Sequence, residues 1–170
     1  MNIILCGMMG AGKTTVGLRL ALSLDRRWVD TDSLIEDEYG DISTIFQSYG
    51  EEYFRGLETK VVEELVQEDG LVISVGGGLV VKEENVALLK RNGKMVYLQA
   101  NTETLTERLA VENSRPLLQT GEGTLFSKVE TLLKKRAPIY ARAADFTVDT
   151  NGKNIESVAL EIEAFLMQNK

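Results

Sequence analysis

An eight-residue stretch near the start of the chain constrains the fold more than any other segment. It reads Gly7-Met8-Met9-Gly10-Ala11-Gly12-Lys13-Thr14 and matches the pattern G-x-x-x-x-G-K-[ST]. The apolar residues 2–6 before it predict a short buried strand, and the apolar spacing at 16–24 after it predicts a helix. A glycine-rich loop between a strand and a helix presents backbone N–H groups and the positive end of the helix to phosphate oxygens. The stretch therefore predicts a nucleotide-binding loop.

The residue types within this loop suit particular atoms of a nucleotide. Lys13 would reach the β- and γ-phosphates, and the hydroxyl of Thr14 would take one position on Mg²⁺. The alternative is a chance glycine-rich turn, which would match this pattern on the order of once in a hundred chains of this length. The other residues of the loop that we expect to contact the nucleotide are Gly10, Ala11, Gly12 and Thr15.

Charge and composition exclude several classes of function. A net charge of -7 argues against a nucleic-acid partner, because such partners usually require a basic face. The chain has no histidine, which excludes His-based catalysis, and the single cysteine, Cys6, excludes an internal disulfide or a cysteine cluster for zinc. No apolar run approaches the ~20 residues that span a membrane, and we find no signal peptide. We expect a soluble, cytoplasmic protein in which Cys6 is a small buried residue.

Predicted strands and helices alternate along the whole chain. Beyond the loop, apolar runs predict strands at 28–32, 71–75, 95–98 and 146–148, and helical spacing recurs at 57–66, 85–91, 105–109, 126–140 and 155–166. This alternation predicts an α/β fold, a parallel sheet covered on both faces within a single domain, residues 1–170. The polar segment between Val111 and Gly123 breaks the pattern, and we interpret it as mobile.

Two helix signals accompany this pattern. Ser33 is the expected N-cap of a short helix after the second strand, with Glu36 as its capping-box partner. Pro138 is expected to bend or end the helix that contains it.

Two carboxylates stand at the predicted end of the second strand. Asp30 and Asp32 are two residues apart, so on a strand both would point to the same face. One could support Mg²⁺ through its water shell, while the other could orient or deprotonate a substrate hydroxyl. The alternative is a pair of solvated turn residues, one of which caps the next helix.

Arginines and glycines elsewhere suggest an anionic ligand. Arg55 and Glu58 are one helical turn apart, where a fixed guanidinium could grip a carboxylate, although an ordinary surface ion pair is the alternative. Arg136 shares an apolar helical stripe with Tyr140. A charge on such a stripe is energetically costly unless the side chain is paired, reaches solvent by snorkelling or binds an anion. The glycines 76–78 follow a buried strand, where they allow close backbone approach to a ligand or form a flexible turn.

Arg115 lies in the polar segment. A loop arginine that closes over ATP would stabilise the transferring phosphoryl group, and a solvated loop charge is the alternative.

Taken in order, these motifs resemble shikimate kinase over essentially the whole chain. The residues that carry the resemblance are Gly7–Thr14, Asp30-Thr31-Asp32, Phe54-Arg55-x-x-Glu58, Gly76–Gly78, Arg115-Pro116-Leu117-Leu118 and Arg136-x-Pro138-x-Tyr140. The resemblance implies a P-loop NTPase fold of the nucleoside-monophosphate-kinase type, with a five-stranded parallel sheet, helices on both faces and a mobile lid near 111–123. It also implies ATP-dependent phosphorylation of the shikimate 3-hydroxyl, which yields shikimate 3-phosphate and ADP on the route to chorismate and the aromatic amino acids.

The resemblance also assigns roles by position. It implies catalytic roles for Lys13, Asp32 and Arg115, and Mg²⁺ contacts for Thr14 directly and Asp30 indirectly. We expect ATP and shikimate as small-molecule partners, no nucleic-acid or membrane partner, and a monomer. Family members often carry arginine in the adenine-side loop, where this chain has Lys153, so adenine packing is expected to be looser. The residues implied to contact shikimate are Asp32, Phe46, Phe54, Arg55, Gly76, Gly77, Gly78 and Arg136.

Three other functions are compatible with the same phosphate-binding loop. Another small-molecule kinase could act on a sugar acid or a nucleotide, but an acceptor without a carboxylate would leave Arg55 and Arg136 without a role. A GTP switch would need an N-K-x-D motif, which is absent, although 37–40 and 149–152 both match D-x-x-G. The intact set of Lys13, Thr14, Asp30 and Asp32 argues against a non-catalytic ATP-binding module.

Overall fold

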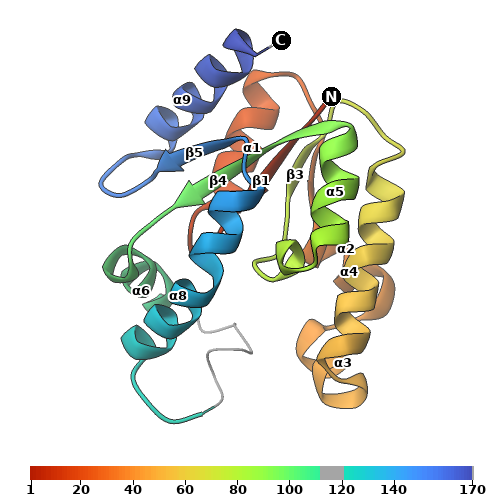
Figure 1. Cartoon of the computed structure of the whole chain (residues 1–170), viewed down its shortest axis with the longest axis vertical. Helices are drawn as coiled ribbons and strands as arrows, with labels where there is room; N and C mark the ends of the chain where they lie inside the picture. The colour runs from red at the N-terminus through yellow and green to blue at the C-terminus, as the bar shows by residue number, and fades with distance from the viewer. Residues whose placement is uncertain (112–120, 170) are drawn as a thin grey trace.

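A computed structural model of the chain describes residues 1–111 and 121–169 and contains a five-stranded parallel sheet (Figure 1). The order across the sheet is β2-β3-β1-β4-β5, and every neighbouring pair is parallel. This confirms the predicted sheet, and β1 is central because its uninterrupted apolar run can be buried on both faces. The strands are β1 Asn2–Cys6, β2 Trp28–Asp30, β3 Val72–Ser74, β4 Gly93–Gln99 and β5 Phe146–Asp149.

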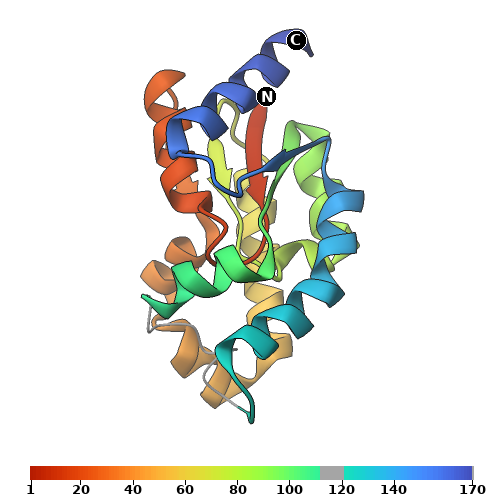
Figure 2. The same cartoon turned by 90° about the vertical axis from the view of Figure 1, so that its left-hand side faces the viewer.

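Helices cover both faces of the sheet, as predicted. Figure 2 shows α1 and α9 on one side of the strands and α5 and α8 on the other. Helix α4 packs against α2, α3 and α5, and both chain termini lie at the end of the molecule opposite α3 and α6 (Figure 1). The helices are α1 Lys13–Ser23, α2 Thr31–Tyr39, α3 Ile42–Tyr49, α4 Glu51–Leu65, the short 3₁₀ helix η1 Leu79–Val81, α5 Glu83–Arg91, α6 Thr102–Ala110, α8 Leu125–Ala143 and α9 Ile155–Gln168.

The core lies on both faces of the sheet and includes Cys6. Its side chain is fully buried, as predicted, and burial raises the pKa of the thiol to about 12, so the sulfur stays protonated. Within the described ranges, 1–111 and 121–169, no helix combines the length and the apolar character that crossing a bilayer requires.

Two local predictions were wrong. β2 ends at Asp30, whose carboxylate caps α2 by accepting hydrogen bonds from the N–H groups of Asp32 (2.9 Å) and Ser33 (3.2 Å). Asp32 is therefore in the first turn of a helix rather than on a strand, and Ser33 is not the cap. An aspartate is favoured at this N-cap position because its negative charge also complements the positive end of the helix.

Helix α3 was not predicted, and α8 runs further than Pro138. Asp41 caps α3 by accepting from the N–H of Thr44 at 2.9 Å, and Gly50, with φ 84°, separates α3 from α4. α8 continues to Ala143 because the buried Tyr140 and Ala143 hold its last turns against the core despite the missing proline N–H.

Candidate active site

The glycine-rich loop leads from β1 directly into α1. Gly12 is the N-cap of α1 with φ 95°, a left-handed conformation that favours glycine, and none of the described side chains caps the helix. The first N–H groups of α1 can therefore face an anion. Lys13 folds back over the loop, where its Nζ donates to the carbonyls of Gly7 (2.8 Å) and Met8 (2.9 Å).

A cavity of about 640 Å³ opens at the carboxyl ends of the strands, a volume typical of small-molecule sites. The structure brings nearly all the predicted site residues to this one cavity. Arg115 and most of the predicted lid, 112–120, lie outside the described residues. The predicted residues that line it are Gly10, Ala11, Gly12, Lys13, Thr14, Thr15, Asp30, Asp32, Phe46, Phe54, Arg55, Gly76, Gly77, Gly78, Arg136 and Lys153.

Asp32 lies on a helix rather than a strand, and its carboxylate faces Gly76, Gly77 and Gly78, which we call the glycine triplet. A Cβ placed on Gly76 would lie 2.6 Å from Oδ1 of Asp32, so the absence of a side chain makes room for the carboxylate. The N–H of Gly76 donates to the hydroxyl of Thr31 at 2.9 Å, which ties the triplet to the start of α2. The two elements therefore form one wall of the cavity.

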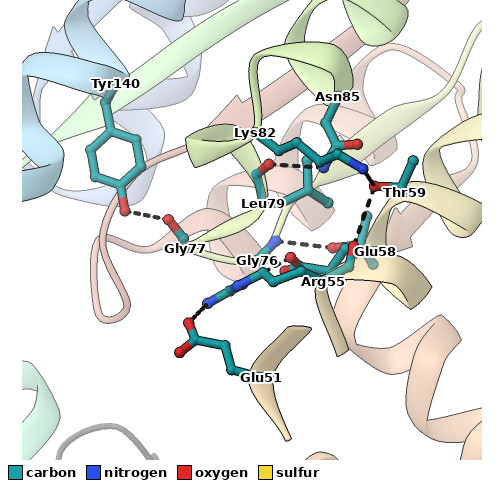
Figure 3. Close-up of polar contacts among 11 residues, drawn as sticks. Glu51, Arg55, Glu58, Thr59, Gly76, Gly77, Leu79, Lys82, Asn85 and Tyr140 are labelled. Carbon is teal, nitrogen blue, oxygen red and sulfur yellow. Dashed lines mark hydrogen bonds and ion pairs between the residues drawn. The ribbon is translucent and has the colours of Figure 1, made fainter. Parts of the chain in front are cut away.

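Arg55 and Glu58 form more than the surface ion pair considered as the alternative. Nη1 of Arg55 donates to Oε2 of Glu58 at 2.8 Å, and only 1% of the Glu58 side chain is exposed. Burial raises the pKa of the Glu58 carboxyl to about 7, while Arg55 opposes the rise and the charge of Asp32 adds to it. The guanidinium of Arg55 also contacts Oε1 of Glu51 at 3.1 Å. Figure 3 shows Arg55 held between these two carboxylates.

Arg136 carries a buried hydrogen-bond donor that has no acceptor in the part of the chain that the structure describes. The residue is 7% exposed, so the structure does not show a snorkelling side chain. Among the described residues, its Nη1 has no hydrogen-bond partner, and it lies 3.2 Å from where a Cβ on Gly77 would be. A buried, unpaired cationic donor is costly unless an anion binds to it.

Two phenylalanines form an apolar part of the cavity wall next to Arg55. The rings of Phe46 and Phe54 pack with centroids 4.8 Å apart, and the Arg55 guanidinium lies 5.3 Å from the centroid of Phe54. The cavity thus pairs an apolar surface with cations, a combination that suits an anionic ring compound.

The structure adds cavity residues that the sequence reasoning missed. Glu58 was part of a motif but was not predicted to line the cavity, and its burial was not visible in the sequence. Arg108, from α6, lines the cavity beside the loop and donates from Nη1 to the carbonyl of Gly10 at 3.1 Å. Lys153, which was predicted, forms an ion pair from its Nζ to Oε1 of Glu161 at 2.7 Å. No pattern marked Arg108, because its contact joins segments 98 residues apart.

The fold and the cavity together define a class of protein. A five-stranded parallel sheet, a phosphate-binding loop after its central strand and a second, arginine-lined region in the same cavity make this chain a P-loop kinase of the nucleoside-monophosphate-kinase type. The family model for shikimate kinase matches residues 9–167, and the chain belongs to the shikimate kinase family.

Individual relatives agree with this family. The chain is 43% identical over 169 residues to shikimate kinase of Thioalkalivibrio sulfidiphilus, which covers 99% of this chain and 88% of the relative. It is 47% identical over 150 residues to shikimate kinase of Neisseria meningitidis serogroup C, covering 88% and 87% of the two chains. The solved structure of shikimate kinase from Acinetobacter baumannii in complex with shikimate superposes with a TM-score of 0.93 at 40% identity, over 99% of this chain and 94% of that one.

Proposed function

We propose that this kinase transfers the γ-phosphoryl group of ATP to the 3-hydroxyl of shikimate, with the two substrates bound at opposite ends of one cavity. The observation that carries the proposal is the buried Nη1 of Arg136, which has no acceptor within residues 1–111 and 121–169 and faces Gly77 in the cavity that the phosphate-binding loop also lines. An acceptor with a carboxylate would satisfy this donor. The triphosphate would bind to the loop.

The nucleotide end supplies charge neutralisation. The backbone from Gly10 to Thr15 would hold the phosphates, and Lys13 would exchange its two carbonyl contacts for phosphate oxygens. Thr14 and Asp30 are oxygen donors that line the same cavity, and they fit the preference of Mg²⁺ for oxygen ligands. When bound, Mg²⁺ would neutralise charge on the β- and γ-phosphates.

The acceptor end would hold the acid by its carboxylate. Arg55 and Arg136 would grip that group, and Phe46 and Phe54 would cover an apolar part of the ring. Asp32 would accept a hydrogen bond from the 3-hydroxyl and orient or deprotonate it as the oxygen attacks the γ-phosphorus and ADP leaves.

Two further cations would complete the nucleotide site. Arg115 remains our proposed lid arginine over the phosphates. Arg108, which lines the cavity beside Gly10, provides the planar guanidinium that Lys153 lacks, and we place it against the adenine. We also propose that the enzyme acts as a cytoplasmic monomer.

A coupled ADP-release assay across a panel of hydroxy acids and nucleotides tests this function. We expect turnover with shikimate that requires Mg²⁺, and phosphorus NMR should identify a phosphate ester on the 3-oxygen. Equal turnover with gluconate or with nucleoside monophosphates would instead favour a different kinase of this fold.

A further inference from the structure

The glycine triplet is held in place from three sides. Three buried side chains from three different helices each make one hydrogen bond to the backbone of 76–79, and Figure 3 shows two of these bonds, those of Tyr140 and Asn85. Such bonds argue against the flexible turn considered from the sequence. The bonds are Gly76 N–H to Thr31 Oγ1 (2.9 Å), Tyr140 O–H to the Gly77 carbonyl (2.6 Å) and Asn85 Nδ2 to the Leu79 carbonyl (3.0 Å).

Tyr140 is the member of this set that lies beside the acceptor end of the cavity. Its side chain is fully buried, and its ring packs on that of Tyr97 with centroids 5.1 Å apart, which restricts its rotation. A Cβ placed on Gly77 would lie 3.5 Å from the hydroxyl oxygen of Tyr140 and 3.2 Å from Nη1 of Arg136. Burial also raises the pKa of the hydroxyl above its ordinary value, although the neighbouring Arg136 guanidinium opposes the rise, so the hydroxyl remains a neutral donor.

The hydroxyl of Tyr140 sets the orientation of a peptide group in the cavity wall. A trans peptide is planar, so fixing the carbonyl of Gly77 toward α8 points the N–H of Gly78 the opposite way. Glycines on both sides of this peptide provide no side chain that could resist its rotation. The same hydroxyl ties the triplet to α8, on which Arg136 lies one turn before Tyr140.

We propose that Tyr140 is a positioning residue for shikimate binding: it holds the peptide after Gly77 at a fixed orientation and distance relative to Arg136. This inference rests on the proposed function, since shikimate is the ligand that would contact this peptide and Arg136 in that arrangement. The other two bonds position the ends of the segment, whereas Tyr140 acts at its centre.

Tyr140→Phe tests the proposal because it removes one oxygen and keeps the ring. We expect the KM for shikimate to rise about five- to tenfold, the factor that corresponds to one neutral hydrogen bond, and the KM for ATP to stay within about twofold. Tyr97→Phe is the matched control, since it removes a hydroxyl from the same aromatic pair without touching the bond to Gly77. It should leave the shikimate KM unchanged.

Amide hydrogen exchange in the ligand-free enzyme provides a second measurement that does not depend on activity. In Tyr140→Phe the amides of 77–79 should exchange faster, and those of β1 should not. Unchanged exchange, an unchanged shikimate KM, or a general loss of stability that raises both KM values would overturn the positioning role. If the wild-type enzyme did not phosphorylate shikimate, the proposed function would fail, and this role in shikimate binding would fail with it, whereas faster exchange would still show that Tyr140 holds the peptide.

Discussion

The guanidinium of Arg55 and the carboxylate of Glu58 meet at 2.8 Å, with the carboxylate almost wholly buried and the guanidinium at the cavity wall. The pair occupies one turn of α4, so the backbone fixes its geometry. A buried carboxylate that stays with its arginine prevents that arginine from swinging into solvent. The relationship makes Arg55 a preorganised grip for an anion and leads to the first prediction.

Glu58→Gln should change how stability depends on pH. Because burial raises the pKa of this carboxyl from 4.5 to about 7, the folded state holds a proton that the unfolded state has released. This contribution to the free energy of unfolding is complete below pH 4.5 and is lost as pH rises toward 7, a change of roughly 3 kcal/mol. Urea unfolding from pH 4.5 to 7.5 should therefore show a flatter profile in the variant. Glu51→Gln, which removes the exposed carboxylate on Arg55, should keep the wild-type slope.

Gly78→Ala should weaken shikimate binding by displacing Arg55. The backbone of Gly78, with φ −96° and ψ −8°, accepts alanine, but the new Cβ would clash with Nη1 of Arg55. Because the clash is with the end of a side chain rather than with backbone, the guanidinium should be displaced from its paired position while the fold survives. We expect the shikimate KM to rise at least about tenfold, the factor for losing a charged hydrogen bond.

A second glycine substitution provides the control for Gly78→Ala. Gly56 lies in the interior of α4 with nothing near its Cβ position, so Gly56→Ala should leave the kinetics unchanged and stabilise the helix by about 0.5–1 kcal/mol. Equal shikimate KM values in Gly78→Ala and wild type would show that Arg55 does not bind the acid.

Arg136→Met should stabilise the free enzyme and abolish its response to shikimate. The substitution replaces a buried cation, whose Nη1 has no partner among the described residues, with an apolar chain of similar length, and we expect a rise in melting temperature of about 2–5 °C. Thermal unfolding with and without shikimate measures both effects, because a bound ligand stabilises the wild type. Arg142→Met, at an exposed position on the same helix, should retain the shikimate-dependent shift. A variant that melts lower and still responds to shikimate would refute the carboxylate grip.

Lys13→Met should abolish turnover while the fold is retained. The ammonium group is the charge that we expect on the β- and γ-phosphates, and losing it should lower kcat by at least about a hundredfold. Circular dichroism would check the fold, and Lys134→Met, which removes an exposed ion pair with Glu130, should leave kcat unchanged. Substantial residual turnover would require another group to neutralise the phosphates.

Local patterns in the sequence were sufficient to predict the sheet and many of the residues that line the cavity. The loop motif places Lys13 and Thr14 at the start of a helix, and the alternation of strands and helices brings strand ends to a common edge, because parallel sheets need crossover helices. Its place on an apolar stripe marked Arg136 as unusual, and the structure shows that the residue is buried. These features depend on spacing within one element, which a single chain displays directly.

The competition between nearby residues could not be resolved from such patterns. Asp30 and Asp32 fit the end of a strand as well as the start of a helix, and the outcome depended on Asp30 capping α2. Helix α3 depends in the same way on a cap at Asp41 and a break at Gly50, rather than on a long apolar period.

The precise arrangement of the site required the folded chain. Tyr140 and Gly77, which are hydrogen-bonded, are 63 positions apart in the sequence, and Arg108 and Gly10 are 98 positions apart. No local sequence motif can therefore predict either contact. The acidity of Glu58 likewise depends on how deeply α4 packs beside the glycine triplet. Residue types along the chain predicted which chemistry was present, because hydrogen-bonding capacity and charge belong to single side chains. Distances, burial and the partner of each group arose from packing, because they are properties of segments brought together by the fold.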